Sequence, residues 1–322
     1  MNRRDALLLA TFAALRPARL LAAPVPVLPF AMTEVAPGIH VRPGVHEEAT
    51  VANQDGIANI GFIIGNAAVA VMDPGGSRAD GERLRASIRQ HTGLPIRYVV
   101  MTHMHPDHVF GAGAFAADEP VFVGHARMEG MLVQRGEFYR NSLADLLGIE
   151  EAGDYAKPNL FVADDATLDL GGRSLRLHAH ATAHTDNDLS IFDEATDTLW
   201  LGDLLFVDRV PALDGSILGW LAQTGAQTGA QTGAQTGALR ASPAKQAVPG
   251  HGPALVPWPE AAAAQEGYLG GIVRDIRAII ARGGDIEQAV ETVGLAERDR
   301  WLLFDDYNGR NVTSAFKELE WE

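Results

Sequence analysis

A six-residue run in the first half of the chain is dense in metal-binding side chains. Residues 103–108 read His-x-His-x-Asp-His, so four potential ligands fall within six positions. Imidazole and carboxylate groups together suit zinc or a neighbouring transition metal. The run therefore predicts metal-assisted hydrolysis, in which a bound metal activates water.

Three more candidate ligands stand singly in the second half of the chain. They are His184, Asp203 and His251, and each lies near the end of a predicted strand, beside a small residue that lets metal and backbone approach. Strand ends at one edge of a sheet converge, so ligands that are distant in sequence can share one site. We therefore expect these three side chains to meet the run at 103–108.

The first half of the chain has the pattern of an α/β sheet. The apolar run 96–101 predicts a buried strand that delivers the ligand run at its C-terminal end. Residues 57–64 and 67–72 predict two strands joined by a tight turn, and residues 79–91 predict an amphipathic helix. A helix over 107–117 and a strand over 120–123 follow, and this alternation indicates a sheet covered by helices.

The second half is less regular. Residues 125–160 are rich in charge and predict a helical insertion over the site, and the pattern is helical again from residue 260. Between them, four short strands are predicted at 166–170, 173–181, 189–193 and 198–202. Residues 223–238 are four copies of Gln-Thr-Gly-Ala, which predict a low-complexity surface linker because a glycine in every repeat disfavours a stable helix.

Composition narrows the choice of partners and ligands. The 322 residues are 47% hydrophobic and 21% charged, as in ordinary globular proteins, and a large core is affordable at this length. A net charge of -15 argues against a nucleic-acid partner, because phosphate binding needs clustered lysine and arginine. The chain has no cysteine, so any metal must be held by histidine, aspartate or glutamate.

The N-terminus has the features of a targeting segment. Arg3 and Arg4 precede the apolar stretch 6–15, and small residues follow at 22–23. The paired arginines resemble a twin-arginine signal and predict export to the periplasm. We therefore expect a signal peptide and connector over 1–30 and a hydrolase domain over 31–322. No other stretch approaches the roughly 20 apolar residues that span a bilayer.

The seven candidate ligands together resemble those of the metallo-β-lactamase fold superfamily, over the chain from about residue 34 onward. The resemblance implies a four-layer αββα sandwich with two zinc ions at one edge of its two sheets. It implies that the first zinc is held by His103, His105 and His184, and the second by Asp107, His108 and His251. Asp203 would bridge the two ions.

A narrower resemblance rests on residues 182–189, 199–206, 209–215 and 301–306. These segments are similar to the quinoprotein relay system zinc metallohydrolases, periplasmic hydrolases associated with pyrroloquinoline-quinone-dependent oxidation. The resemblance implies a periplasmic quinoprotein dehydrogenase system as partner. The Gln-Thr-Gly-Ala repeat departs from this family, in which a helix is expected before the last ligand strand.

The expected activity is hydrolysis by a hydroxide that bridges two zinc ions and attacks a carbonyl carbon. The substrate would be a small ester, thioester or amide, with a β-lactam among the candidates. Asp107 is expected to orient the hydroxide or relay its proton. The alternative is a non-hydrolytic metal-binding accessory protein of the quinoprotein system, although structural zinc sites close at four ligands and this set has seven.

Several neighbouring residues have open interpretations. Asp73 either supports a ligand imidazole or is a turn residue before Pro74, and Thr102 and Thr185 flank ligands that they could hydrogen-bond. Arg209 either pairs with a substrate carboxylate or forms a surface salt bridge. Acidic residues at 305, 306, 318, 320 and 322 argue against a glutathione-type substrate, which would favour a basic pocket.

Overall fold

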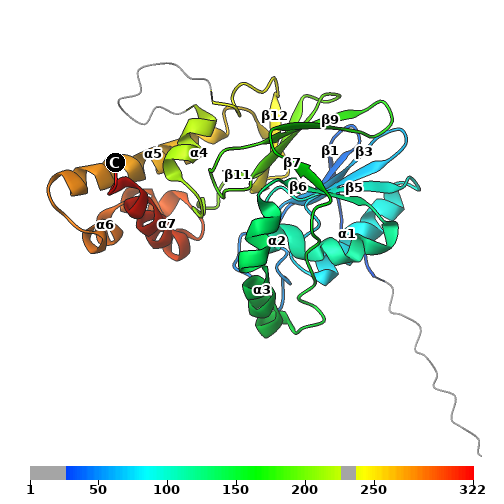
Figure 1. Cartoon of the computed structure of the whole chain (residues 1–322), viewed down its shortest axis with the longest axis horizontal. Helices are drawn as coiled ribbons and strands as arrows, with labels where there is room; N and C mark the ends of the chain where they lie inside the picture. The colour runs from blue at the N-terminus through cyan, green and yellow to red at the C-terminus, as the bar shows by residue number, and fades with distance from the viewer. Residues whose placement is uncertain (1–26, 226–236) are drawn as a thin grey trace, which may run out of the picture.

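The computed structural model describes residues 27–225 and 237–322, and it arranges them as two packed β-sheets with helices on their outer faces (Figure 1). The predicted signal segment lies almost wholly outside the described residues, as does most of the Gln-Thr-Gly-Ala repeat. In the part of the chain that is described, no helix combines the length and apolar character needed to cross a membrane.

The first sheet has seven strands in sequence order. They are β1 (Thr33–Ala36), β2 (Ile39–Arg42), β3 (Ile60–Ile64), β4 (Val69–Met72), β5 (Ile96–Val100), β6 (Val121–His125) and β7 (Leu160–Val162). Strands β1 to β4 pair antiparallel, whereas β4 to β7 pair parallel. The predicted tight hairpin is confirmed, with Ile64 of β3 opposite Val69 of β4. The parallel strands bring the C-terminal ends of β5 and β6 to one edge.

The second sheet has six strands in the order β13-β12-β11-β10-β9-β8. Their bounds are β8 (Asp165–Asp169), β9 (Ser174–Ala179), β10 (Leu189–Asp193), β11 (Thr198–Phe206), β12 (Gln246–His251) and β13 (Val256–Pro257). Only β11 and β12 pair parallel among these strands, which sets Phe206 beside His251 at their C-terminal ends. The two sheets bury one shared core, which includes Met72, Val100 and Trp200.

Helices cover the outer face of the first sheet. They are α1 (Arg78–His91), α2 (Pro106–Val109), the 3-10 helix η1 (Phe110–Asp118) and α3 (Met128–Leu147). Leu84 and Ile88 of α1 are fully buried in a core with Val71 and Val99, as the helical periodicity predicted. The expected single helix over 107–117 is instead α2 followed by η1. A side chain at Gly111 would meet the Pro74 carbonyl at 2.2 Å, so this tight approach requires glycine.

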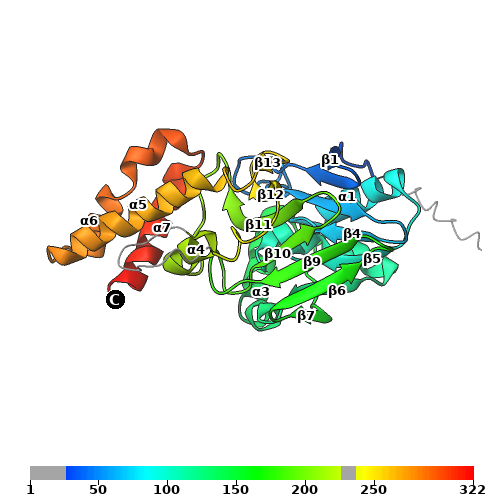
Figure 2. The ribbon, with the colours of Figure 1, turned by 90° about the horizontal axis from the view of Figure 1, so that it is seen from above.

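The outer layer of the second sheet is formed by helices that lie after residue 216. It consists of α4 (Ile217–Thr224), α5 (Ala262–Ala281), α6 (Ile286–Thr292), the 3-10 helix η2 (Leu295–Arg300) and α7 (Phe304–Leu319). Figure 2 shows these helices reaching beyond the sheet at the β11 and β12 end. The four-layer αββα sandwich is therefore confirmed. The first two repeat residues, Gln223 and Thr224, belong to α4, so a helix does precede the last ligand strand.

Candidate metal centre

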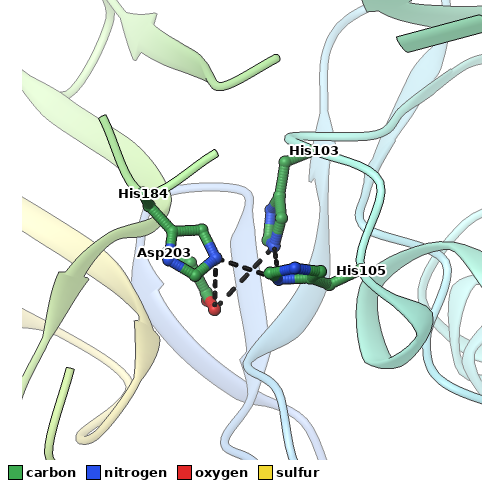
Figure 3. A group of neighbouring side chains, drawn as sticks. All are labelled: His103, His105, His184 and Asp203. Atoms are coloured by element: carbon green, nitrogen blue, oxygen red, sulfur yellow. Dashed lines mark hydrogen bonds and ion pairs between the residues drawn. The ribbon is translucent and has the colours of Figure 1, made fainter. Parts of the chain in front are cut away.

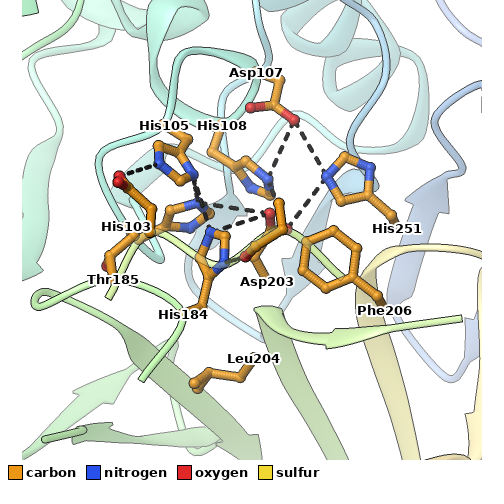
Figure 4. A network of polar contacts seen from close by, with 12 residues as sticks. His103, His105, Asp107, His108, His184, Thr185, Asp203, Leu204, Phe206 and His251 are labelled. Atoms are coloured by element: carbon orange, nitrogen blue, oxygen red, sulfur yellow. Dashed lines mark hydrogen bonds and ion pairs between the residues drawn. The ribbon is translucent and has the colours of Figure 1, made fainter. Parts of the chain in front are cut away.

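Four segments bring all seven candidate ligands together (Figure 4). The run 103–108 follows β5, with its last two ligands in the first turn of α2. His184 lies in the loop between β9 and β10, and His251 ends β12. Asp203 lies inside β11 rather than at its end, because that strand continues to Phe206 instead of ending near residue 202.

The first group comprises three imidazoles and one carboxylate (Figure 3). The Nδ1 atom of His105 lies 3.1 Å from His103 Nε2 and 2.9 Å from His184 Nε2. The Oδ2 atom of Asp203 lies 3.8 Å from His103 Nε2 and 3.4 Å from His184 Nε2. Four ligand atoms thus converge within 4.8 Å of one another, which suits a single tetrahedral ion.

The second group comprises Asp107, His108 and His251. The Oδ2 atom of Asp107 lies 3.6 Å from His108 Nε2 and 3.3 Å from His251 Nε2. Asp203 also faces this group, but with its other oxygen. Its Oδ1 atom lies 3.0 Å from His108 Nε2 and 3.4 Å from His251 Nε2. The two oxygens of one carboxylate therefore point at two separate groups.

Unsatisfied buried atoms indicate that this centre suits a metal. Among the described residues, His108 Nε2 and Asp203 Oδ1 are buried without a hydrogen-bond partner, although they lie only 3.0 Å apart. An orphaned pair of this kind is costly in a protein interior. A cation between these atoms would satisfy both of them, so the donor set fits metal ions.

Contacts behind the imidazoles fix which nitrogen faces the centre. His184 Nδ1 lies 2.6 Å from the Ala212 carbonyl, and His251 Nδ1 lies 2.9 Å from the Ile57 carbonyl. A ring nitrogen beside a carbonyl must carry the proton, so the Nε2 lone pair of each ring is free for a metal. His105 has the opposite orientation and offers Nδ1.

Asp73 supports the imidazole of His108 in the second group, which was one of the two interpretations of this residue. It is fully buried, and its Oδ2 atom lies 2.9 Å from His108 Nδ1. The same carboxylate accepts hydrogen bonds from the backbone N–H and the hydroxyl of Thr102, at 2.7 and 2.9 Å. Thr102 also lies 3.1 Å from His103 Nδ1, as expected. Thr185, by contrast, donates to Asp188 and contacts no candidate ligand.

Asp214 is a supporting residue that the sequence did not reveal. Its Oδ2 atom lies 3.1 Å from His105 Nε2, and it also accepts a short hydrogen bond from Arg135 of α3. His105 is the most exposed of the five imidazoles of the centre, with 17% of its side chain accessible. The contact joins residues 109 positions apart in the chain, and no local pattern marks it.

Glycine is required at two positions that border Asp203. A side chain at Gly250 would place its Cβ 2.0 Å from Asp203 Oδ1. At Gly202 the backbone has φ +50, and a Cβ would lie 2.5 Å from the hydroxyl of Thr102. The small residues beside the ligands thus admit a close approach of β11 to β12 and to β5.

Burial sets the protonation of the first group. It lowers the pKa of His103 well below its usual range and the pKa of His184 to about 4. These imidazoles are therefore neutral near pH 7, the form that binds metals. Burial raises the pKa of Asp203, but His251 and His108 outweigh it and hold that pKa well below its usual range. Asp203 is thus ionised, the form in which a carboxylate can bind a metal.

The family of the chain follows from a match to a known family model. The model of the metallo-β-lactamase superfamily matches residues 53–251, which include all seven candidate ligands. The chain belongs to the metallo-β-lactamase superfamily. The narrower resemblance to quinoprotein relay hydrolases stays a prediction.

Several solved structures share this fold. A metallo-β-lactamase from Pontibacter korlensis is 17% identical, with a TM-score of 0.56, over 74% of this chain and 98% of that one. The DIM-1 metallo-β-lactamase is 16% identical, with a TM-score of 0.55, over 76% and 98%. A double mutant of the sec-alkyl sulfatase PisA1 is 14% identical, with a TM-score of 0.62, over 89% and 50%. At these identities the likeness shows the fold alone.

One curated relative is similar in sequence over a short segment. A linear primary-alkylsulfatase from Pseudomonas sp. is 36% identical over 58 residues, which are 18% of this chain and 11% of that protein. The match thus spans a small part of the sulfatase. The superfamily member described here carries two groups of histidine and aspartate residues that could hold metal ions.

A cleft of about 540 Å³ opens onto the centre. Its floor includes His105, Asp107, Asp203 and His251. One wall comes from α3, which confirms that the stretch after β6 borders the site, and another comes from α7. Arg209 lines the cleft, is buried with 3% exposure and forms an ion pair with the exposed Glu48.

Two other histidines lie away from this centre. His178 and His180 line a separate cavity of about 460 Å³ on the second sheet. His180 is buried and lies 2.7 Å from the hydroxyl of Ser190 and 3.1 Å from the side-chain oxygen of Gln223. These contacts give it a structural role.

Proposed function

We propose that the protein is a binuclear zinc hydrolase that attacks the carbonyl of an ester, thioester or amide. The observation that carries the proposal is the placement of Asp203, whose Oδ2 faces one ligand group and whose Oδ1 faces the other. A structural site closes at four ligands and needs no such shared carboxylate. Two ions on either side of Asp203 would use all seven side chains.

The proposed roles follow the two groups. The first ion would be held by His103, His105 and His184, the second by Asp107, His108 and His251, with Asp203 shared between them. When bound, the zinc ions supply Lewis acidity and lower the pKa of water towards neutrality. The chain has no cysteine, so this chemistry replaces a thiol nucleophile.

Asp107 is the ligand best placed to act on a proton. It lines the cleft, and 12% of its side chain is exposed, whereas His108 beside it is fully buried. Its carboxylate is ionised, because His108 and His251 outweigh the effect of burial and lower its pKa. We infer that Asp107 orients the attacking water and accepts its proton. Asp107→Asn should then reduce kcat far more than metal content; an equal loss of both would contradict this role.

The substrate class is tested by a panel. Nitrocefin, a lactone, a thioester and simple esters would be offered to the zinc-loaded protein, with metal-free protein as the control. A sulfate ester belongs in the panel as a second candidate, because the relative matched over 58 residues is an alkylsulfatase. Turnover of a carbonyl substrate that depends on zinc supports the proposal, whereas turnover of the sulfate ester alone would replace it.

The cellular setting is also a proposal. Arg3 and Arg4 before an apolar stretch support export by the twin-arginine route, and the resemblance supports service to a periplasmic quinoprotein dehydrogenase system. The alternative role is that of a metal-binding accessory protein in the same system. Zinc-loaded protein that turns over no member of the panel, yet binds a quinoprotein dehydrogenase tightly, would favour the accessory role.

A further inference from the structure

Helix α7 presents an arginine side chain to the cleft. Arg310 lines the cleft and is exposed, and among the described residues it has no ion-pair or hydrogen-bond partner. Ser314 lies one helical turn later on the same face and also lines the cleft. Its hydroxyl likewise has no hydrogen bond to the described part of the chain. A guanidinium and a hydroxyl can both donate hydrogen bonds to an anion.

A chain of side-chain contacts connects the candidate metal centre to Arg310. Nη1 of Arg209 lies 3.4 Å from His251 Nδ1, and its Nη2 donates to the Tyr307 hydroxyl at 2.9 Å. The guanidinium groups of Arg209 and Arg310 lie 5.3 and 5.4 Å from the centre of the Tyr307 ring. Arg310 is therefore linked to the candidate ligand His251 through the Tyr307 ring and the Arg209 guanidinium.

Arg209 is already satisfied, so it cannot be the anion receptor. It is buried, donates to the Glu47 carbonyl at 3.3 Å and lies 3.5 Å from a carboxylate oxygen of Glu48. With the Tyr307 hydroxyl, these contacts occupy both terminal nitrogens. Arg209 fixes the position of Tyr307, and Arg310 on the other side of that ring is accessible to a ligand.

The acidic residues of the C-terminus have partners outside the cleft. Glu318 accepts hydrogen bonds from Ser216 and Ile217, and Glu322 pairs with Arg277. Asp305 lies 2.9 Å from Arg298. None of these carboxylates lines the cleft. The acidic C-terminus therefore does not set the charge of the α7 wall, where the charged residue that lines the cleft is Arg310. The argument against a glutathione-type substrate stays a prediction.

Helix α3 forms a different, largely apolar wall. Tyr139, Leu143 and Leu146 all line the cleft, and Leu146 is 39% exposed although it is a large hydrophobic residue. An exposed leucine in a ligand cleft gains stability when an apolar group covers it. The cleft thus offers one apolar wall and one cationic rim around the same centre.

We propose that the natural substrate carries a carboxylate away from its scissile bond, bound by Arg310 and Ser314, and an apolar segment that packs on α3. This inference rests on the proposed carbonyl hydrolase function and names its substrate class: an anionic, partly apolar ester or thioester. Specificity for the anion comes from α7, a helix outside the two sheets that carry the ligands.

Two matched ester pairs test the inference on the zinc-loaded full chain. The first pair is mono-(4-nitrophenyl) adipate and 4-nitrophenyl hexanoate, which differ in an acyl carboxylate. The second pair is 4-carboxyphenyl hexanoate and phenyl hexanoate, which differ in a leaving-group carboxylate. The wild type should prefer the anionic member of at least one pair by about three- to tenfold in kcat/KM, mainly through KM, and the preference should fall with salt.

Arg310→Gln should abolish this preference. The matched control is Arg298→Gln, which removes the same charge from an arginine that also lies against an aromatic ring of α7 but does not line the cleft. Leu146→Ser should weaken the gain in kcat/KM with longer acyl chains, with Val133→Ser as its control on the same helix. Val133 is 69% exposed and lies outside the cleft.

The outcomes separate this inference from the proposed function. Turnover without an anion preference, or a preference that survives in Arg310→Gln, overturns the inference and leaves the hydrolase function standing. If no ester is turned over, the hydrolase function fails for esters, and binding of monomethyl adipate to the zinc-loaded protein decides the inference. Binding three- to tenfold weaker in Arg310→Gln supports it, and equal binding overturns it.

Discussion

Replacing Asp214 by asparagine should weaken the first metal site without touching a ligand. Asp214 lies 3.1 Å from His105 Nε2 and holds the ring so that Nδ1 faces the centre. Asparagine keeps the shape but loses the charge, and a hydrogen bond to a charged group is roughly twice as strong as a neutral one. Partners behind a metal-bound histidine are typically worth about 10–100-fold in metal affinity.

The structure places this variant near the lower end of that range. The side chain of Asp214 is 34% exposed, so solvent screens its interaction with His105, and the asparagine oxygen could still accept the proton. We therefore expect zinc to bind about tenfold more weakly, which corresponds to about 1.4 kcal/mol. Asp214→Ala, which leaves no acceptor, should approach a hundredfold loss.

Competition with a chromophoric chelator measures the affinity directly, and cobalt absorption reports whether His105 still binds in the first group. Asp145→Asn is the control, because Asp145 is an exposed aspartate of the neighbouring helix α3 without a contact to the centre. An Asp214→Asn variant that binds zinc as tightly as the wild type, with an unchanged cobalt spectrum, would refute the positioning role of Asp214.

Three further predictions follow from single contacts. Gly250→Ala should displace Asp203 and lower zinc content below two per chain, because the new Cβ would lie 2.0 Å from Asp203 Oδ1; metal analysis checks this. Burial lowers the pKa of His180 to about 4, so its stabilising effect is complete above pH 6.5 and is lost as the pH falls towards 4. Urea unfolding should then show the advantage of the wild type over His180→Gln shrinking by about 2 kcal/mol between pH 7 and pH 5. Removing zinc with a chelator should lower Tm, since His108 Nε2 and Asp203 Oδ1 become unsatisfied; an unchanged Tm would contradict the fit of the site.

Much of the scaffold was readable from the sequence because its signals are local. The hairpin of β3 and β4 and the helix α1 follow from periodicity and turn chemistry within a few residues. The convergence of His184 and His251 on the run 103–108 also followed, since strand ends at one edge meet. Short strands such as β1 and β2 carried too few residues for a clear pattern.

The supporting residues were not readable, because they depend on how distant segments dock. Asp214 lies in the loop that follows β11, and His105 lies in the loop that follows β5. The two residues meet only because the fold packs these two loops together. The place of Arg310 and Tyr307 in the cleft could not be predicted from the sequence. It depends on how α7 packs beside the second sheet and on which of its faces lines the cleft. The acidic character of the C-terminus did not indicate that an arginine of α7 lines the cleft.

The shared carboxylate of Asp203 is the central claim, and zinc stoichiometry tests it most directly. Wild type and Asp203→Asn would be equilibrated at the same buffered free zinc, and bound metal and ester turnover would be measured together. The wild type should hold two zinc ions per chain and reach full turnover only with the second, while Asp203→Asn should lose metal from both groups. An Asp203→Asn variant that keeps two zinc ions, or a wild type fully active with one, would contradict the account.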